Sequence, residues 1–131
     1  MYKQIDHISL QVSNVETSTA FYNKLGFQQL NRPSFDFDGA WFGIGKTQQL
    51  HLIEGLTTKV NSGRRNTHFA VSVEDINEFE AHLTQLDISY QPPKPRPDGV
   101  VQIFLQDPDG YFWEFNEGGK LFSFTSLHHK T

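Results

Sequence analysis

An internal repeat is the feature that most constrains what this chain can fold into. Residues 7–27 and 68–88 superpose without a gap at a constant offset of 61 positions, which places His7 on His68. Identical residues are sparse, but the spacing of apolar residues and the leading histidine agree in both segments. Self-similarity at a fixed offset indicates a duplicated supersecondary unit. The sequence therefore predicts two modules of the same fold.

The length of the chain limits how these modules are organised. A chain of 131 residues is one domain's worth and is large enough to bury a sizeable core. Its hydrophobic content of 37%, with 10 glycines, is ordinary for a globular protein. We predict a single domain made of module one (1–60), module two (61–118) and a polar tail (119–131).

Each module is predicted to begin with a strand followed by a helix. Leu10 and Val12 alternate with polar residues, which is the pattern of a strand that buries one face. Ser13 or Asn14 then caps a helix that ends at Gly26. The helix of module two has an apolar face made of Ile76, Phe79, Leu83 and Leu86.

Three short strands are predicted after each helix. Their ranges are 27–31, 39–45 and 48–54 in module one, and 88–91, 99–106 and 111–117 in module two. The segment Asp107–Gly110 is a turn, because proline fixes φ and glycine permits positive φ. The Pro-rich segment 92–98 is predicted to be a loop, since proline cannot donate to a central strand. The predicted fold class is α+β, with the order βαβββ in both modules.

Polar residues interrupt the apolar closing strand of each module. His51 interrupts the apolar run of residues 50–53, and Glu114 interrupts the aromatic run of residues 112–115. If the loops of module two hold two extra residues, His51 corresponds to Glu114, as His7 corresponds to His68. Modules paired about a pseudo-twofold axis would bring these four side chains to one point.

This donor set predicts a metal site. Three imidazoles and one carboxylate suit a single divalent ion such as Zn²⁺, Ni²⁺, Co²⁺, Mn²⁺ or Fe²⁺. The chain has no cysteine, which excludes thiolate ligands and cysteine nucleophiles. A carboxylate buried among aromatic side chains also needs a partner, because an unpaired buried charge costs several kcal/mol. We expect four ligands: His7, His51, His68 and Glu114.

Three segments carry a resemblance to a known superfamily. They are DHISLQVSNVETSTAFYNKLGF, HFAVSV and DPDGYFWEF. Over residues 5–117 the chain resembles the vicinal oxygen chelate superfamily, which includes glyoxalase I, fosfomycin-resistance proteins, extradiol dioxygenases, methylmalonyl-CoA epimerase and bleomycin-resistance proteins. The segments RPSFDFDGAWFGIG and LHLIE resemble the glyoxalase-like subgroup. The resemblance implies an eight-stranded open barrel or cup of paired βαβββ modules, commonly as a dimer.

The resemblance also implies a function. His7, His68 and Glu114 match ligand positions of the superfamily, and position 51 matches a fourth position that is Glu or Gln in many glyoxalases. It implies a lyase or isomerase of glyoxalase type, in which a divalent ion chelates two adjacent substrate oxygens and Glu114 is ligand and base. Because His51 replaces a carboxylate, one of the two bases is missing, so poor isomerisation of hemithioacetals is predicted.

Other activities within the superfamily stay open at this point. The His, His, Glu set alone is used by fosfomycin-resistance enzymes, which add a thiol or water to an epoxide; His51 would then contact substrate or the ligands. A ligand-sequestering protein of bleomycin-resistance type needs no metal, and retention of the ligand positions argues against it. An extradiol dioxygenase would usually need a longer chain.

Four further residues are predicted to contact a small, anionic substrate. Arg64 and Arg65 directly precede the strand that starts at His68, where a guanidinium can hold an anionic group by bidentate contact. Phe37 and Trp41 belong to an aromatic group that is predicted to wall an apolar pocket.

Charge and hydropathy indicate which partners the protein has. The net charge of −4 gives no basic surface for nucleic acid or an anionic membrane. No apolar stretch is long enough to span a membrane, and the absence of cysteine favours a cytoplasmic location. A homodimer is expected, because an open cup leaves strand edges and apolar surface that a second copy would cover.

Overall fold

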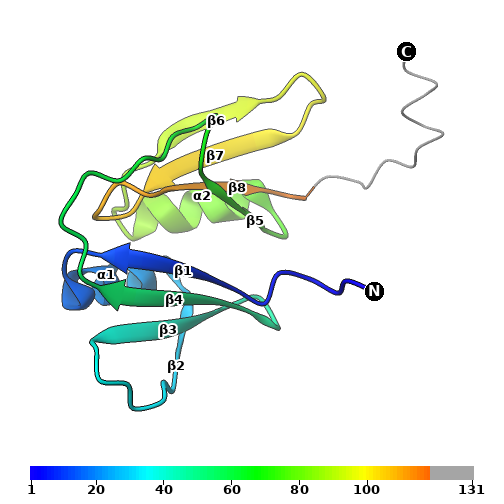
Figure 1. Ribbon diagram of the computed structural model, residues 1–131. Helices are drawn as coiled ribbons and strands as arrows, with labels where there is room; N and C mark the ends of the chain where they lie inside the picture. Colours follow the sequence, from blue (N-terminus) through cyan, green and yellow to red (C-terminus); the bar gives the residue numbers. More distant parts are fainter. Residues whose placement is uncertain (119–131) are drawn as a thin grey trace.

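The computed structural model describes residues 1–118, and the predicted tail, 119–131, lies outside the described residues. The described chain forms two four-stranded sheets, each with its own helix (Figure 1). The elements are, in chain order, β1 (His7–Val12), α1 (Val15–Leu25), β2 (Gln28–Leu30), β3 (Gly39–Ile44), β4 (Gln48–Glu54), β5 (Phe69–Ser72), α2 (Ile76–Gln85), β6 (Gln91–Pro95), β7 (Val101–Gln106) and β8 (Phe112–Asn116). The prediction of an α+β fold with the order βαβββ in each half is confirmed.

Both sheets have the same topology. The strand order is β1-β4-β3-β2 in one sheet and β5-β8-β7-β6 in the other. In each sheet the first and last strands of the module are parallel, and the remaining pairs are antiparallel. The repeat seen in the sequence is therefore a repeat of sheet topology. His51 on β4 and Glu114 on β8 lie on corresponding strands of the two sheets.

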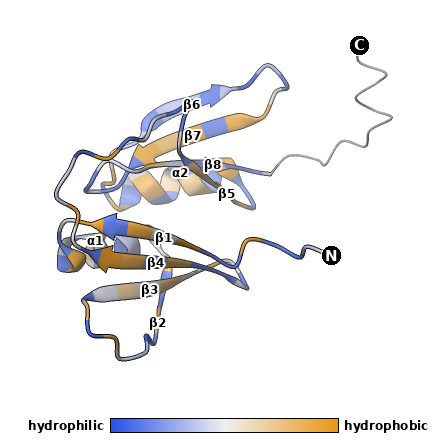
Figure 2. Ribbon diagram, in the orientation of Figure 1, coloured by the Kyte–Doolittle hydropathy of each residue, from blue (hydrophilic) through white to orange (hydrophobic). Residues whose placement is uncertain are grey.

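The first sheet buries one face and leaves the other more accessible, whereas in the second sheet Glu114 and Phe104 are buried although they lie on the face opposite Trp113. Leu10 on β1 and Leu50 and Leu52 on β4 are buried, whereas His7 and His51 lie on the opposite face. Inner and edge strands also differ in hydropathy. In Figure 2 the inner strand β7 is predominantly hydrophobic, whereas the edge strand β6 is pale to hydrophilic. The alternation in each strand thus decides which polar side chains remain free for chemistry.

The first helix begins and ends at the predicted residues. The side chain of Asn14 accepts a hydrogen bond from the backbone N–H of Thr17, at 2.9 Å, which satisfies one of the free donors of the first turn. Gly26 ends the helix with φ of 107°, a conformation that residues with a side chain avoid. These local contacts set the direction in which the chain leaves α1 toward β2.

The prediction for the Pro-rich segment 92–98 is wrong in part, because part of it is a strand. It was expected to be a loop preceded by a strand at 88–91, but the strand is β6, Gln91–Pro95. The prolines are tolerated because β6 is an edge strand and its pairing with β7 is irregular between Gln91 and Lys94. The prediction that this segment is not a central strand agrees with this position.

A buried hydrogen-bond network joins the two halves. The hydroxyl of Tyr22 on α1 donates to Asp107 Oδ2 at 2.6 Å and accepts from Trp113 Nε1 on β8 at 2.9 Å. The other oxygen of Asp107 accepts two backbone N–H groups of its own turn, at 3.0 and 2.9 Å. At the surface beside this network, Asp109 accepts from the hydroxyl of Ser13 at 2.6 Å. The predicted turn of module two is therefore also the contact that holds α1 of module one.

None of the helices among residues 1–118 combines the length and the apolar character needed to cross a membrane.

Candidate metal centre

The four predicted ligands lie in two pairs, one on each sheet. His7 on β1 and His51 on β4 share the accessible face of the first sheet, with ring centroids 4.2 Å apart. His68, directly before β5, and Glu114 on β8 form the second pair. Among residues 1–118 of one chain, no group of three or more histidine or acidic side chains is placed to hold one ion. We refer to the His7–His51 pair and the His68–Glu114 pair as the two candidate half-sites of the chain.

The second pair is a close contact between an imidazole and a carboxylate. Nε2 of His68 lies 3.1 Å from Oε1 of Glu114, which is buried. Two ligand atoms at ~2.1 Å from one ion, at right angles to each other, are separated by ~3 Å, so this spacing fits adjacent ligands.

The other ring nitrogen of His68 and the other carboxylate oxygen of Glu114 each have a hydrogen-bond partner of their own. The N–H at Nδ1 of His68 donates to the backbone carbonyl of Gly63 at 3.1 Å, so Nε2 is the nitrogen that faces Glu114. Asn116 donates from Nδ2 to Oε2 of Glu114 at 2.7 Å, and the Asn116 carbonyl accepts from the N–H of Gly118. Such support fixes the tautomer and orientation of metal ligands. Asn116 lies two residues after Glu114 on the same face of β8, and this spacing was the available sequence signal for its role.

His7 is oriented in a similar way. Its Nδ1 lies 2.8 Å from a carboxylate oxygen of Asp6, so the Nδ1 proton is donated to Asp6 and Nε2 is left free. A carboxylate behind a histidine raises the basicity of the other ring nitrogen and is common in metal sites. The sequence reasoning missed Asp6, although its position directly before His7 was visible.

His51 differs from the other two histidines. Its Nε2 is the nitrogen that is engaged, because it lies 2.8 Å from the amide oxygen of Gln49. Its ring is stacked between His7 on one side and Trp41 on the other. Burial, followed by the neighbouring His7, lowers the pKa of His51 below its usual value of 6.5, which favours the neutral ring.

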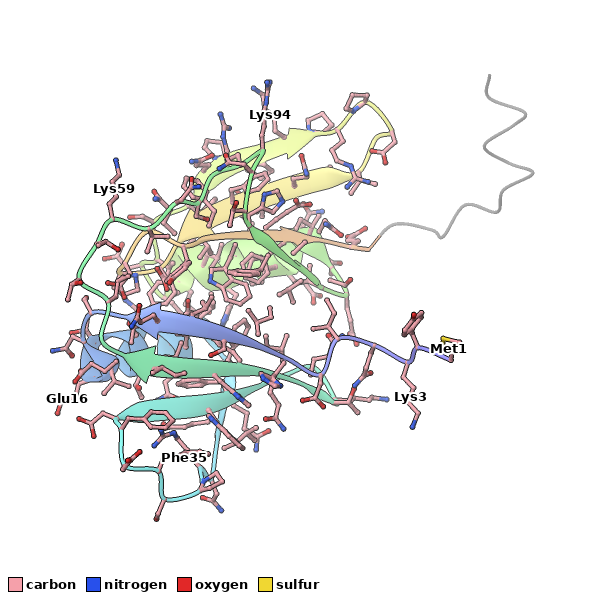
Figure 3. All side chains as sticks on the ribbon, in the orientation of Figure 1. Met1, Lys3, Glu16, Phe35, Lys59 and Lys94 are labelled. Atoms are coloured by element: carbon pink, nitrogen blue, oxygen red, sulfur yellow. The ribbon has the colours of Figure 1, made fainter. Side chains whose placement is uncertain are left out.

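A basic pocket lies beside the second pair. It has a volume of about 470 Å³ and is lined by Arg64, Arg65, Asn66, Gln91, Pro92, Lys94, Gln102 and Phe104. Phe104 lies next to both members of the pair. It is the register partner of Glu114, and its ring packs edge-on against the His68 ring, with the two ring centroids 5.5 Å apart. Lys94 extends from β6 toward solvent (Figure 3). Arg64 and Arg65 thus line a pocket that shares Phe104 with the surroundings of the His68–Glu114 pair.

The two predicted aromatic contacts lie on the other sheet. Trp41 is half-buried and stacks on His51. Phe37 is 43% exposed in the loop between β2 and β3, where it stacks on Phe35. The Arg32 guanidinium lies over the Phe35 and Phe37 rings, at 4.8 and 4.9 Å from their centroids. Phe35 is labelled in Figure 3. Phe37 therefore belongs to an exposed aromatic group and does not touch either half-site through a contact of its own.

Comparison with known proteins agrees with this architecture. A family model described as the glyoxalase/bleomycin resistance protein/dioxygenase superfamily matches residues 4–115. The chain is 32% identical over 122 residues to Glyoxylase I 4 of Arabidopsis thaliana, covering 84% of this chain and 68% of that protein. It is 34% identical over 119 residues to a lactoylglutathione lyase of Neisseria meningitidis, covering 83% of this chain and 86% of that protein.

A solved structure shows the same fold. The crystal structure of a glyoxalase family protein from Bacillus anthracis superposes with a TM-score of 0.73 at 29% identity, covering 91% of this chain and 98% of that one. Because the family match spans both modules and all four candidate ligand positions, the chain belongs to the glyoxalase/bleomycin resistance protein/dioxygenase superfamily, also called the vicinal oxygen chelate superfamily.

Proposed function

We propose that this protein is a divalent-metal-dependent enzyme of glyoxalase type, a lyase or isomerase acting on a small anionic substrate with two adjacent oxygens. The observation that carries the proposal is the His68–Glu114 pair, whose ligand atoms are 3.1 Å apart and whose other polar atoms are each held by a hydrogen bond. His7 would be the third protein ligand. A bound ion supplies Lewis-acid polarisation of the two substrate oxygens.

The residues around the pair have separate roles in this proposal. Arg64, Arg65 and Lys94 bind the anionic group of the substrate and orient it toward His68 and Glu114. Phe104 provides an apolar wall and limits the access of water to the pair. Glu114 holds or moves a proton at the carboxylate oxygen that faces the substrate, while Asn116 keeps the other oxygen in place.

We further propose that two copies of the chain complete the site, the first sheet of one copy facing the second sheet of the other. Two observations support this arrangement. The half-sites of one chain do not form a group of three ligands within residues 1–118, and both lie on faces that the core does not use. In the described residues, β1 and β5 each have one hydrogen-bonded strand neighbour, so each is an edge strand of its sheet.

Metal binding tests the proposal directly. Equilibrium dialysis against Mn²⁺, Zn²⁺ or Ni²⁺, followed by elemental analysis, should give one ion per chain for the wild type. Glu114→Gln keeps the shape of the side chain but loses the charge, and it should weaken binding of the preferred ion by at least ~10-fold. The exposed Glu74→Gln is the matched control and should bind as the wild type does.

The outcome also separates the alternatives. Stoichiometric binding that is lost in Glu114→Gln supports an enzyme site, and a substrate screen with the loaded protein then distinguishes isomerisation from addition of a thiol or water to an epoxide. With a single carboxylate at the site, turnover of the hemithioacetal of methylglyoxal and glutathione should be poor. A wild-type protein that binds none of these ions would contradict the proposal and favour a metal-free ligand-sequestering role.

A further inference from the structure

Three aromatic rings form a continuous stack on the accessible face of the first sheet. The His51 ring lies between His7, at 4.2 Å between centroids and 15° between planes, and Trp41, at 4.0 Å and 3°. Trp41 and His51 are cross-strand partners in the β3–β4 register, so the sheet itself creates their contact. Both faces of the His51 ring are therefore covered by other rings.

This stack bears on which histidines can bind one ion. The lone pair of an imidazole nitrogen lies in the plane of its ring, and a bound ion lies close to that plane. His7 and His51 are stacked in nearly parallel planes, so close to the two rings their in-plane lone pairs do not point at a common position. An ion bound in the plane of the His7 ring would therefore lie well outside the plane of the nearby His51 ring, where His51 offers no lone pair.

A hydrogen bond opposes the rotation that would change this. Nε2 of His51 donates to the amide oxygen of Gln49 at 2.8 Å. Gln49 is the register partner of His7 on the neighbouring strand, so the same backbone pairing that places His7 also places Gln49. To aim a nitrogen at an ion held by His7, His51 would lose this hydrogen bond and both stacking contacts.

We propose that His51 is a positioning residue, clamped by Trp41 and Gln49, which holds the His7 ring in place and does not itself bind the ion. This inference rests on the proposed metal site of His7, His68 and Glu114. The site then has three protein ligands. More of the coordination sphere is left to the two substrate oxygens than in a site with four protein ligands. The equivalence of His51 with Glu114 in strand position is not an equivalence in role.

Two substitutions at position 51 separate a clamp from a ligand. His51→Phe keeps a flat ring that stacks between His7 and Trp41 but has no nitrogen to bind an ion. We expect it to bind one Mn²⁺ per chain with an affinity within a few-fold of the wild type. His51→Ala removes the ring and frees His7, and we expect it to weaken binding by ~10–100-fold, as is typical for loss of a residue that supports a metal ligand.

The ligand control is His7→Phe, which should abolish stoichiometric binding. If His51→Phe loses binding to the same extent as His7→Phe, His51 is a ligand and the inference is overturned. If His7→Phe and Glu114→Gln both bind as the wild type does, the proposed site itself is wrong. The two failures are therefore distinguishable, and circular dichroism of each variant checks that it is folded.

A second measurement needs no variant. Nitrogen NMR of the wild-type protein labelled at histidine should show resonances of His7 and His68 that shift when Zn²⁺ is added, because one nitrogen of each becomes a ligand. Both nitrogens of His51 should keep the resonances of a neutral ring protonated at Nε2. A zinc-induced shift at Nδ1 of His51 as large as that of the His7 ligand nitrogen would overturn the inference.

Discussion

At the scale of single residues, the hydroxyl of Tyr22 links the two modules through two buried hydrogen bonds. Tyr22 is fully buried, and its one hydroxyl connects Asp107, in the turn of module two, with the indole N–H of Trp113. Burial, followed by the nearby Asp107, raises the pKa of Tyr22, so the hydroxyl stays protonated and remains a donor. Removing a hydroxyl that hydrogen-bonds two buried partners lowers the free energy of unfolding, because both partners are left unsatisfied.

Removing this hydroxyl should destabilise the fold. Tyr22→Phe leaves a carboxylate oxygen and an indole N–H without their partner in the core, and the expected loss in the free energy of unfolding is about 1–3 kcal/mol. Urea unfolding followed by circular dichroism measures the change. Tyr2→Phe is the matched control, because Tyr2 is exposed and its substitution should leave the midpoint unchanged. Equal effects of the two substitutions would contradict the role of the network.

The partner of Tyr22 predicts a dependence on pH. Burial raises the pKa of Asp107 above its usual value of 3.8, despite the hydrogen bonds that favour the charged form. A raised folded-state pKa means that the folded protein binds this proton more tightly than the unfolded chain does. The contribution of Asp107 to stability is therefore fully present below about pH 3.8 and is lost as the pH rises through the folded-state pKa.

The prediction is tested as a difference between proteins. The free energy of unfolding of the wild type minus that of Asp107→Asn should fall as the pH is raised from about 4 toward neutrality, because the neutral amide does not titrate. Urea titrations at several pH values give this difference while other titrating groups cancel. A difference that rises with pH would mean that the hydrogen bonds, and not burial, dominate at Asp107.

At the scale of elements, two glycines show how backbone geometry limits the choice of residue. Gly26 ends α1 at φ of 107°, and Gly45 lies in the turn between β3 and β4 at φ of 62°. Space is not the constraint at either position, since a Cβ would meet nothing closer than 3.7 Å at Gly26 and nothing within 4 Å at Gly45. The left-handed region open to residues with a side chain lies near φ of +60°, which includes the second glycine and excludes the first.

The two glycines should therefore respond differently to alanine. Gly45→Ala should cost about 1–2 kcal/mol in the free energy of unfolding, the usual cost of a left-handed conformation for a residue with a Cβ. Gly26→Ala should cost more, because alanine cannot adopt its φ without moving the end of α1. Chemical denaturation of both variants gives the comparison, and a smaller loss for Gly26→Ala would refute this account.

At the scale of the whole molecule, the fold separates the ligands that the repeat relates. Each module builds its own sheet, so His7 is held by one sheet, and His68 and Glu114 by the other. The network at Tyr22 fixes how the two modules of one chain sit together. Under the proposed function, an ion shared between these residues would require a second copy of the chain, which would bring its own two pairs.

Mixing two defective variants tests this arrangement. His7→Ala and Glu114→Ala each lack one ligand, so neither forms a complete site as a homodimer. In a mixed dimer, the first sheet of the Glu114→Ala chain and the second sheet of the His7→Ala chain form one intact site, and binding of Mn²⁺ should return on mixing. Sedimentation should give twice the mass of one chain. No recovery from variants shown to exchange subunits would mean that the half-sites do not meet between copies.

Much of the fold could be predicted because it depends on local patterns. The alternation in β1 and β4, the cap at Asn14 and the glycine at the end of α1 are each decided within a few residues. The exception is β6. Local rules place prolines in a loop, but an edge strand whose irregular ladder tolerates them arises only from the position of β6 in the sheet.

In the candidate site, too, some features follow from the local sequence and others only from the tertiary structure. The sequence alone determined that His51 and Glu114 occupy equivalent strands and that each points away from the apolar face, because side chains alternate with a period of 2. The contacts of those side chains were decided by tertiary structure. Asn116 behind Glu114, Trp41 and His7 against His51, and the split of the ligands between two sheets depend on how strands pair and sheets pack. A pattern along one strand fixes the direction of a side chain, but the atoms that meet it come from other strands.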